Sequence, residues 1–173
     1  LNALVEAGDS LAKLPIEIFD ATAQILNTAD IEAHVRQMDS PPDAIIVDHI
    51  HIMEVPPHKR KKYSGGEYED VSTISTGLRL LANMLDIPVI ALAQLSRNVE
   101  ARTNKRPVMP DLKSSGSLEQ DANYIILVYR DDYYNKHSTR KGELDLLLVK
   151  NRHGNTGDVT VRFDPRIQSF SSL

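Results

Sequence analysis

The sequence predicts an α/β fold in which a mostly parallel sheet is flanked by helices and extended by an antiparallel C-terminal hairpin. Two short apolar runs, at 44–47 and 89–92, are rich in β-branched residues and lack strict alternation, which is typical of strands covered on both faces. A helical pattern separates these two runs. The second half carries three strand-like runs with no long helix between them, which favours antiparallel pairing.

The helix between the two apolar strands is expected at 69–85. Its apolar residues recur at three- and four-residue spacing, and Pro88 follows the end of the pattern. These residues are Val71, Ile74, Leu78, Leu81 and Leu85. A strand, a helix and a second strand form a βαβ unit with parallel strands. Upstream, we expect a further strand at 15–19 and a helix at 30–38 that is capped by Asp30.

The second half is expected to supply the antiparallel part of the sheet. Strand-like runs lie at 124–129, 143–149 and 158–163, and a turn at 154–157 would join the last two as a hairpin. The middle run alternates in a way that indicates burial on one face and partial burial on the other.

Composition indicates one globular domain over residues 1–173. Hydrophobic side chains make up 41%, and 20 Lys and Arg against 24 Asp and Glu give a formal charge of -4, which excludes a highly charged disordered chain. No apolar run approaches the ~20 residues that span a bilayer, so we expect no membrane insertion. The absence of cysteine excludes disulfides, thiolate metal sites and cysteine nucleophiles, and favours the cytoplasm.

Two polar side chains follow the apolar strands. Asp48 comes directly after the first strand, and Gln94 follows the second. Ligands of open α/β sheets bind at the carboxyl ends of such strands. There an aspartate can hold Mg²⁺ beside nucleotide phosphates, and a glutamine can contact the terminal phosphate or orient the attacking water. Taken singly, Asp48 can equally be an ordinary acid at a strand end, and Gln94 a loop-stabilising amide.

Lys150, Asn151 and Arg152 lie at the tip of the late hairpin. Two cations one residue apart point the same way from an extended strand. Such a tip can act as an arginine finger on the nucleotide of another subunit, where it stabilises the charge that develops on the transferred phosphoryl group. Ordinary solvated hairpin charges are the alternative.

Positive charge also gathers in two long loops, at 54–66 and 96–116. The first contains the basic run 58–62. The cations of the second are Arg97, Arg102, Lys105, Arg106 and Lys113. Because small residues follow Lys113, backbone amides there can approach phosphate oxygens closely. The loops favour contact with a nucleic-acid backbone, and a flexible solvated loop is the alternative.

Two further patterns give little support for chemistry. His49, His51 and His58 lack the carboxylate-supported spacing of a metal site, so packing or loop roles are favoured. None of the 8 glycines is followed by Lys-Ser or Lys-Thr, so the phosphate-binding P-loop motif is absent. This polypeptide alone therefore lacks the cradle for β- and γ-phosphates.

Together these stretches resemble the C-terminal, RecA-like motor domain of replicative DNA helicases of the DnaB family. The similarity keeps the family order over residues 43–163 and is looser over the first 40 residues. It is carried by the Walker B-like segment 45–53, the segment 88–97, Lys105-Arg106-Pro107, the segment 111–122, the run 128–131 and the tip 150–157.

The resemblance implies a RecA-like P-loop NTPase core within a ring-shaped homo-hexamer. Such a ring uses ATP and Mg²⁺ to move 5′ to 3′ along single-stranded DNA and to separate the duplex. Asp48 would bind Mg²⁺, and Gln94 would sense the γ-phosphate within the same subunit. Lys150, Asn151 and Arg152 would reach the nucleotide of the adjacent subunit, with Arg152 as the finger.

The same resemblance implies DNA contacts and partners. Lys113, Ser114 and Gly116 match the family's DNA-contacting loop, and a primase and a helicase loader are the implied protein partners. The sequence departs from the family at His49 and His51, where a tyrosine and a glutamine are usual. It also has Lys113-Ser114 where the family usually has Arg-Glu.

The resemblance further implies that the chain is partial. The chain begins with Leu1 rather than Met, and the Walker A segment, the catalytic glutamate and the primase-interacting domain would all precede Leu1. We therefore expect little ATPase activity from these residues alone. One alternative is a non-catalytic RecA-like protein that binds single-stranded DNA or serves as a ring adaptor. The other is a RecA-like recombinase or clock-type ATPase. The block 116–121 favours the helicase.

Overall fold

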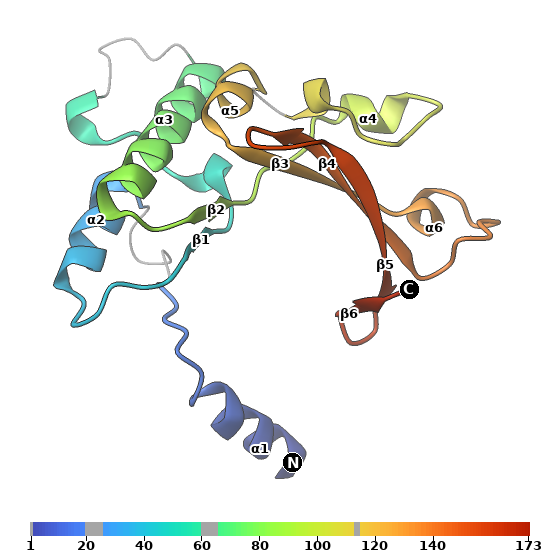
Figure 1. Ribbon diagram of the computed structural model, residues 1–173, viewed down its shortest axis with the longest axis horizontal. Coiled ribbons are helices and arrows are strands. Elements are labelled where there is room, and N and C mark those ends of the chain that lie inside the picture. The colour runs from blue at the N-terminus through green and yellow to red at the C-terminus, as the bar shows by residue number, and fades with distance from the viewer. Residues whose placement is uncertain (1, 20–25, 60–65, 113–114) are drawn as a thin grey trace.

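The computed structural model describes residues 2–19, 26–59, 66–112 and 115–173 and shows a mixed α/β fold with two separate sheets (Figure 1). Its helices and strands are α1 (Asn2–Leu11), α2 (Thr28–Gln37), β1 (Ile45–Val47), α3 (Glu67–Leu85), β2 (Val89–Ala91), α4 (Asn98–Ala101), α5 (Ser115–Asp121), β3 (Tyr124–Tyr129), α6 (Asp131–Tyr134), β4 (Glu143–Asn151), β5 (Gly157–Asp164) and β6 (Ser169–Ser172). Among the described residues, no helix has both the length and the apolar character needed to cross a membrane.

The predicted βαβ unit is confirmed. β1 and β2 pair in parallel, with Ile45 opposite Val89 and Val47 opposite Ala91, and α3 is the crossover helix between them. Because the two strands are in register, their carboxyl ends lie at the same edge of the sheet. This edge carries the side chains singled out from the sequence.

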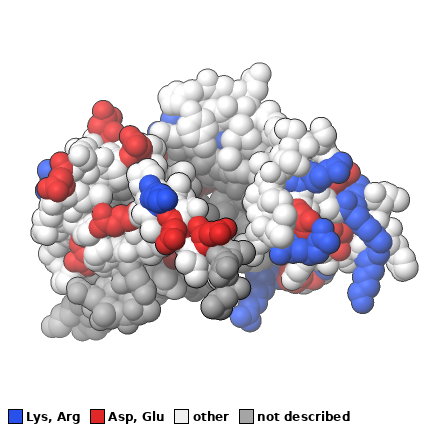
Figure 2. All heavy atoms as spheres, turned by 90° about the horizontal axis from the view of Figure 1, so that it is seen from below, with Lys and Arg blue, Asp and Glu red and all other residues white. Residues whose placement is uncertain are grey.

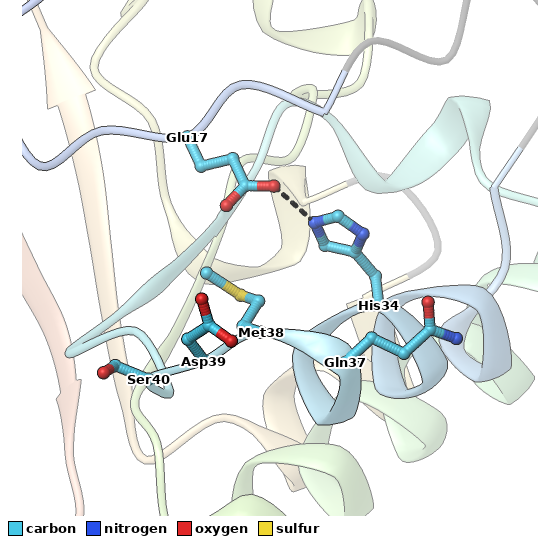
Figure 3. A pocket seen from close by; sticks show the side chains of 6 residues that line it. All are labelled: Glu17, His34, Gln37, Met38, Asp39 and Ser40. Atoms are coloured by element: carbon cyan, nitrogen blue, oxygen red, sulfur yellow. Dashed lines mark hydrogen bonds and ion pairs between the residues drawn. The ribbon is translucent and has the colours of Figure 1, made fainter.

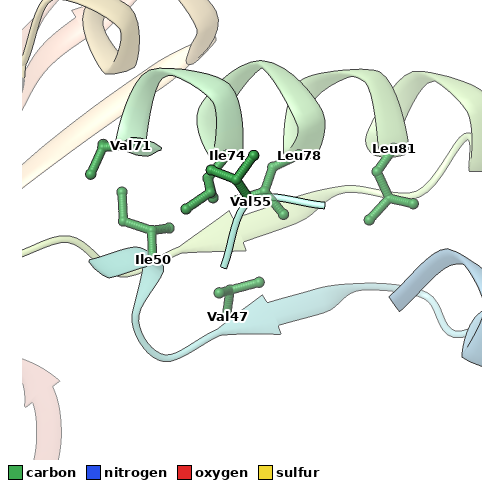
Figure 4. Close-up of a cluster of buried hydrophobic side chains, with 7 residues drawn as sticks. All are labelled: Val47, Ile50, Val55, Val71, Ile74, Leu78 and Leu81. Atoms are coloured by element: carbon green, nitrogen blue, oxygen red, sulfur yellow. The ribbon is translucent and has the colours of Figure 1, made fainter. Parts of the chain in front are cut away.

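The main core lies between α3 and the β1–β2 sheet (Figure 4). The helical spacing predicted from the sequence brings apolar side chains of α3 to one face, where they pack on residues around β1. The buried set is Val47, Ile50, Val55, Val71, Ile74, Leu78 and Leu81. Full burial of each such side chain contributes about 1.5–3 kcal/mol, so this cluster holds the crossover helix on its strands.

The expectation that β1 and β2 are covered on both faces is wrong. Ile46 is 68% exposed and its partner Ile90 is 52% exposed. The α3 side of the sheet is covered, whereas no described element covers the side that carries this pair. An uninterrupted apolar run shows that both faces are apolar but does not show that both are packed.

Two upstream expectations also need correction. Residues 15–19 form no strand: Ile16 and Ile18 are exposed, and the segment has no ladder partner among the described residues. The second helix begins at Thr28 rather than near Asp30, and its N-cap is Asn27. Asp30 instead completes a capping box, since its carboxylate accepts from the Asn27 backbone N–H at 3.1 Å.

The antiparallel prediction is confirmed for the second half. β3, β4, β5 and β6 follow one another in the sheet, and β4 and β5 form the predicted hairpin. Leu127 and Leu147 are buried on its inner face together with Leu112. The strand β6 was not predicted from the sequence. A single mostly parallel sheet is not found, because β2 and β3 share no ladder among the described residues, and only β1 and β2 pair in parallel.

Candidate functional site

The carboxyl ends of β1 and β2 bring Asp48 and Gln94 to one edge of the sheet. Beyond the paired strands, the backbone N–H of Leu92 donates to the Val47 carbonyl at 2.9 Å, and that of Ile50 donates to the Leu92 carbonyl at 3.0 Å. These bonds hold the two chain segments together past the strand ends. Asp48 and Gln94 are both exposed there. The predicted pair therefore faces the space where ligands of such sheets bind.

His49 contacts Gln94 directly. The His49 Nε2 and Gln94 Nε2 atoms are 3.2 Å apart, so the neutral ring can accept from the amide at this position. The His49 Nδ1 atom is buried and has no hydrogen-bond partner among the described residues. This contact was not predicted from the sequence, which paired Gln94 with Asp48 instead.

Asp48, the single carboxylate among the described residues at this edge, suits a Mg²⁺ ion that nucleotide phosphates also bind. It does not suit a metal centre that is enclosed by protein ligands alone. Mg²⁺ is usually held by one or two carboxylates together with substrate phosphates. Asp48 offers one exposed carboxylate, which makes no hydrogen bond or ion pair with another described residue. In the described ranges, no group of three or more His, Asp or Glu side chains is arranged to hold a metal, so the disfavoured histidine site gains no support.

The cation tip, Lys150 to Arg152, lies against the C-terminal end of α5. Lys150 Nζ donates to the Glu119 carbonyl, and Arg152 Nη2 donates to the Gln120 carbonyl at 3.0 Å. The last carbonyls of a helix have no partner within the helix and carry partial negative charge. The Arg152 side chain nevertheless remains exposed. It is therefore held in place without being removed from solvent.

Asn151 is used differently from its two neighbours. Its Nδ2 atom donates to the Asn155 carbonyl at 3.0 Å, and its Oδ1 atom accepts from the His153 backbone N–H at 3.1 Å. Both polar ends of the amide thus close the turn between β4 and β5. This arrangement holds the backbone that presents Lys150 and Arg152.

Of the predicted DNA-contacting residues, Lys113 and Ser114 lie outside the described residues. Gly116 lies at the start of α5, where a Cβ atom would be 2.6 Å from the Tyr68 hydroxyl of α3. A glycine at this position therefore permits close packing of α5 on α3. This contact gives Gly116 a packing role that the sequence analysis did not foresee.

The segment after Gln94 leads directly to the predicted DNA-contacting loop. Leu95 forms an antiparallel bridge with Leu112, and the Ser96 backbone N–H donates to the Asp111 carbonyl at 2.6 Å. The loop 96–112 is thereby closed at its base. Residues far apart in the sequence become neighbours, which spacing alone could not reveal.

Two cations of that loop form internal ion pairs rather than a free basic surface. Arg102 Nη2 is 2.6 Å from Asp111, which is buried. Arg106 pairs with Asp145 at 2.6 Å and with Asp158 at 2.8 Å, and its guanidinium lies 5.6 Å from the centre of the Tyr129 ring. Carboxylates of the same chain therefore pair with both arginines, so these two cations add less free positive charge to the loop than the sequence suggested.

Charge is nevertheless distributed unevenly over the described residues of one face. In Figure 2, acidic side chains gather at the end that carries α2 and α3, and basic side chains gather at the end that carries α6 and β5. Cations outside the predicted loops include Lys136, just after α6, and Arg162 on β5.

A cavity of about 540 Å³ lies elsewhere, next to the C-terminal end of α2 (Figure 3). Its lining residues are Glu17, His34, Gln37, Met38, Asp39 and Ser40. Glu17 and His34 point toward each other and are 2.7 Å apart. No residue predicted for nucleotide or DNA contact lines this cavity, which is open and polar.

Comparisons with a family model and with known proteins point to the same family. Residues 1–172 match the family model described as the DnaB-like helicase C terminal domain. The chain is 37% identical over 172 residues to the replicative DNA helicase DnaB of Geobacillus stearothermophilus, which covers 98% of this chain and 37% of that protein. It is 35% identical to the replicative DNA helicase DnaC of Bacillus subtilis strain 168, with the same coverage. The chain thus spans little more than a third of these relatives.

Solved structures agree with this match. A structure described as an ATPase domain superposes with a TM-score of 0.87 at 34% identity, over 98% of this chain and 59% of that chain. A DnaB-like replicative helicase, whose structure describes its interactions with primase, superposes with a TM-score of 0.88 at 34% identity and covers 98% of this chain and 40% of its own. The sequence match over nearly every residue and the shared fold lead to one conclusion: the chain belongs to the DnaB-like helicase C-terminal domain family.

Proposed function

We propose that this chain is part of the motor domain of an ATP-dependent replicative DNA helicase that unwinds duplex DNA in the 5′-to-3′ direction. The observation that carries the proposal is the common edge of the β1–β2 sheet, where Asp48 and Gln94 lie on neighbouring parallel strands. A carboxylate and an amide at one strand-end edge suit the metal and the terminal phosphate of a nucleotide.

The proposed roles follow from the chemistry of each side chain. Asp48 binds Mg²⁺, which, when bound, neutralises charge on the nucleotide phosphates. Gln94 contacts the γ-phosphate or orients the attacking water, because its amide can donate and accept. Lys150 and Arg152 reach the nucleotide of the adjacent subunit, and Arg152 stabilises the developing negative charge. Asn151 holds the turn that presents them.

The proposed assembly is a homo-hexameric ring in the cytoplasm. Lys113, Ser114 and Gly116 line its central channel and contact the backbone of single-stranded DNA. A primase and a helicase loader are the proposed protein partners. The family match supports these assignments, and the solved relative described together with primase supports that partner in particular.

Arg152→Ala in the full-length protein tests the proposal. An arginine finger contributes about 10³-fold or more to turnover, so we expect DNA-stimulated ATP hydrolysis to fall by that order while nucleotide binding persists. Arg166→Ala is the matched control, because Arg166 is 85% exposed and, within the described ranges, pairs only with Asp164 two residues away. Unchanged turnover in the Arg152 variant would remove the tip from catalysis and would contradict the proposed motor.

A further inference from the structure

One carboxylate joins α5 to α3. Asp121, at the end of α5, accepts from Ser75 Oγ at 2.8 Å, from Thr76 Oγ1 at 3.1 Å and from Arg79 Nε at 2.9 Å. Its side chain is only 15% exposed. All three donors come from consecutive turns of α3. A charge-assisted pair with two additional hydroxyl donors fixes the rotation and height of α5 on α3.

The same end of α5 holds the cation tip. The carbonyls of Glu119 and Gln120 accept from Lys150 and Arg152, and the Asn123 carbonyl, two residues past Asp121, accepts from the Arg152 backbone N–H at 3.0 Å. These acceptors lie on either side of Asp121, close to it in the sequence. The position of the tip is therefore set by the position of this end of α5.

α3 is in turn the crossover helix of the unit that carries Asp48 and Gln94. Its buried face packs on Val47 and Ile50, immediately beside Asp48. A continuous set of contacts thus runs from the strand-end edge through α3 and Asp121 to the cation tip. These contacts fix the position of Arg152 relative to the strand-end edge of the same subunit, although Arg152 and that edge are distant in the sequence.

We infer that Asp121 is a positioning residue for the cation tip. The inference rests on the proposed function, in which the tip acts on the nucleotide of the next subunit. Asp121 does not contact that nucleotide; it holds the C-terminal end of α5 so that Lys150 and Arg152 are presented in one geometry. Because a misplacement of about 1 Å can cost ~10²-fold in rate, loss of this anchor should slow turnover without touching Asp48 or Gln94.

The test uses Asp121→Ala and Asp121→Asn in the full-length protein, with two measurements. Hydrogen exchange reports the Arg152 amide, whose acceptor is the Asn123 carbonyl. We expect exchange there to be at least ~10-fold faster in the alanine variant, since the exchange rate reports how often this hydrogen bond opens and therefore reports local stability. Steady-state kinetics should show DNA-stimulated kcat lowered at least ~10-fold, with KM for ATP changed less than about twofold.

The Asp121→Asn variant keeps an acceptor for the Ser75 and Thr76 hydroxyls but removes the charge that pairs with Arg79. Its exchange rate and its kcat should therefore lie between those of the wild type and of Asp121→Ala. It should also fold if Asp121→Ala does not. Glu32→Gln on α2 is the control, because it also removes a carboxylate that pairs with an arginine of a helix, Arg36, at 2.9 Å. Wild-type exchange at Arg152 and turnover within about twofold of wild type in the Asp121 variants would overturn the inference. That result would leave the proposed function standing if Arg152→Ala still abolished turnover, so the two failures are distinguishable.

Discussion

Asp145 is the most heavily engaged carboxylate in the described part of the chain. It is 3% exposed and accepts from Arg106 at 2.6 Å, from Arg140 at 2.5 and 3.0 Å, and from Thr160 at 2.8 Å. The hydrogen bonds from Arg140 above all, and then those from Thr160 and Arg106, hold the pKa of Asp145 well below its usual value although burial acts in the opposite direction. The carboxylate is therefore charged and satisfied in the folded protein.

Asp145→Asn should destabilise the fold by about 3 kcal/mol, the low end for breaking a buried ion pair, because its arginine partners are 35% and 38% exposed. Urea unfolding at neutral pH measures this difference. Asp164→Asn is the matched control, since Asp164 pairs with an exposed arginine and its replacement should lower the unfolding free energy far less than Asp145→Asn does. Equal stability of the two variants would show that the Asp145 network contributes no more than a surface pair.

The lowered pKa of Asp145 also predicts the direction in which the free energy of unfolding changes with pH. Its folded pKa is lowered, so its contribution is fully present above the unfolded value of about 3.9 and is lost as the pH falls below that value toward the folded pKa. The stability difference between wild type and Asp145→Asn should therefore be constant from about pH 7 to about pH 5 and shrink below about pH 4. A difference that grows on acidification would contradict this assignment.

For individual residues, the order of the strands predicted positions in the structure better than the clustering of charge in the sequence did. Sequence reasoning placed Asp48 and Gln94 on one edge because parallel strands align their ends, and the structure brings them there. It assigned Arg106 to a free basic loop because the partners of this residue, Asp145 and Asp158, lie 39 and 52 positions away. It could not find the acceptors of Arg152, because they are backbone carbonyls that every residue has.

Among the elements, helices with a periodic apolar face were predicted closely and their caps less so. The spacing that predicted a helix at 69–85 corresponds to α3, because side chains three and four residues apart must share a face. The strand expected at 15–19 is absent and β6 was missed for one reason: a strand needs a neighbour, and a local pattern does not contain that neighbour.

The start of α2 provides a test at this scale. Asn27 Oδ1 accepts from the backbone N–H groups of Ala29 at 2.9 Å and Asp30 at 3.3 Å. Asn27→Ala leaves both donors without this partner and should cost about 1 kcal/mol of unfolding free energy, measured by urea titration. Asn27→Ser retains a hydroxyl acceptor and should stay within a few tenths of a kcal/mol of wild type. Equal loss in both variants would show that the contribution of Asn27 lies elsewhere.

For the whole molecule, the main departure from expectation is an apolar surface where packing was predicted. Ile46 and Ile90 are paired across β1 and β2 and share the uncovered face. On β3, Ile126 and Val128 are more than half exposed, and Val159 on β5 is as well. Exposed apolar surface of this kind promotes binding of other apolar groups.

The 173-residue chain should therefore bind a hydrophobic fluorescent dye and self-associate with rising concentration. Replacing Ile46 and Ile90 together by Thr should lower both signals, because it removes apolar area from the uncovered face while the β-branched shape suits a strand. Unfolding free energy should change by less than about 1 kcal/mol, as is usual for exposed positions. Ile74→Thr is the contrasting control: Ile74 is 1% exposed on the buried face of α3, so the same substitution buries a hydroxyl and leaves a void there. If the double variant binds the dye as strongly as the original chain, the dye binds elsewhere, at the exposed apolar residues of β3 and β5 or at loosened packing around α3, rather than at the uncovered face of β1 and β2.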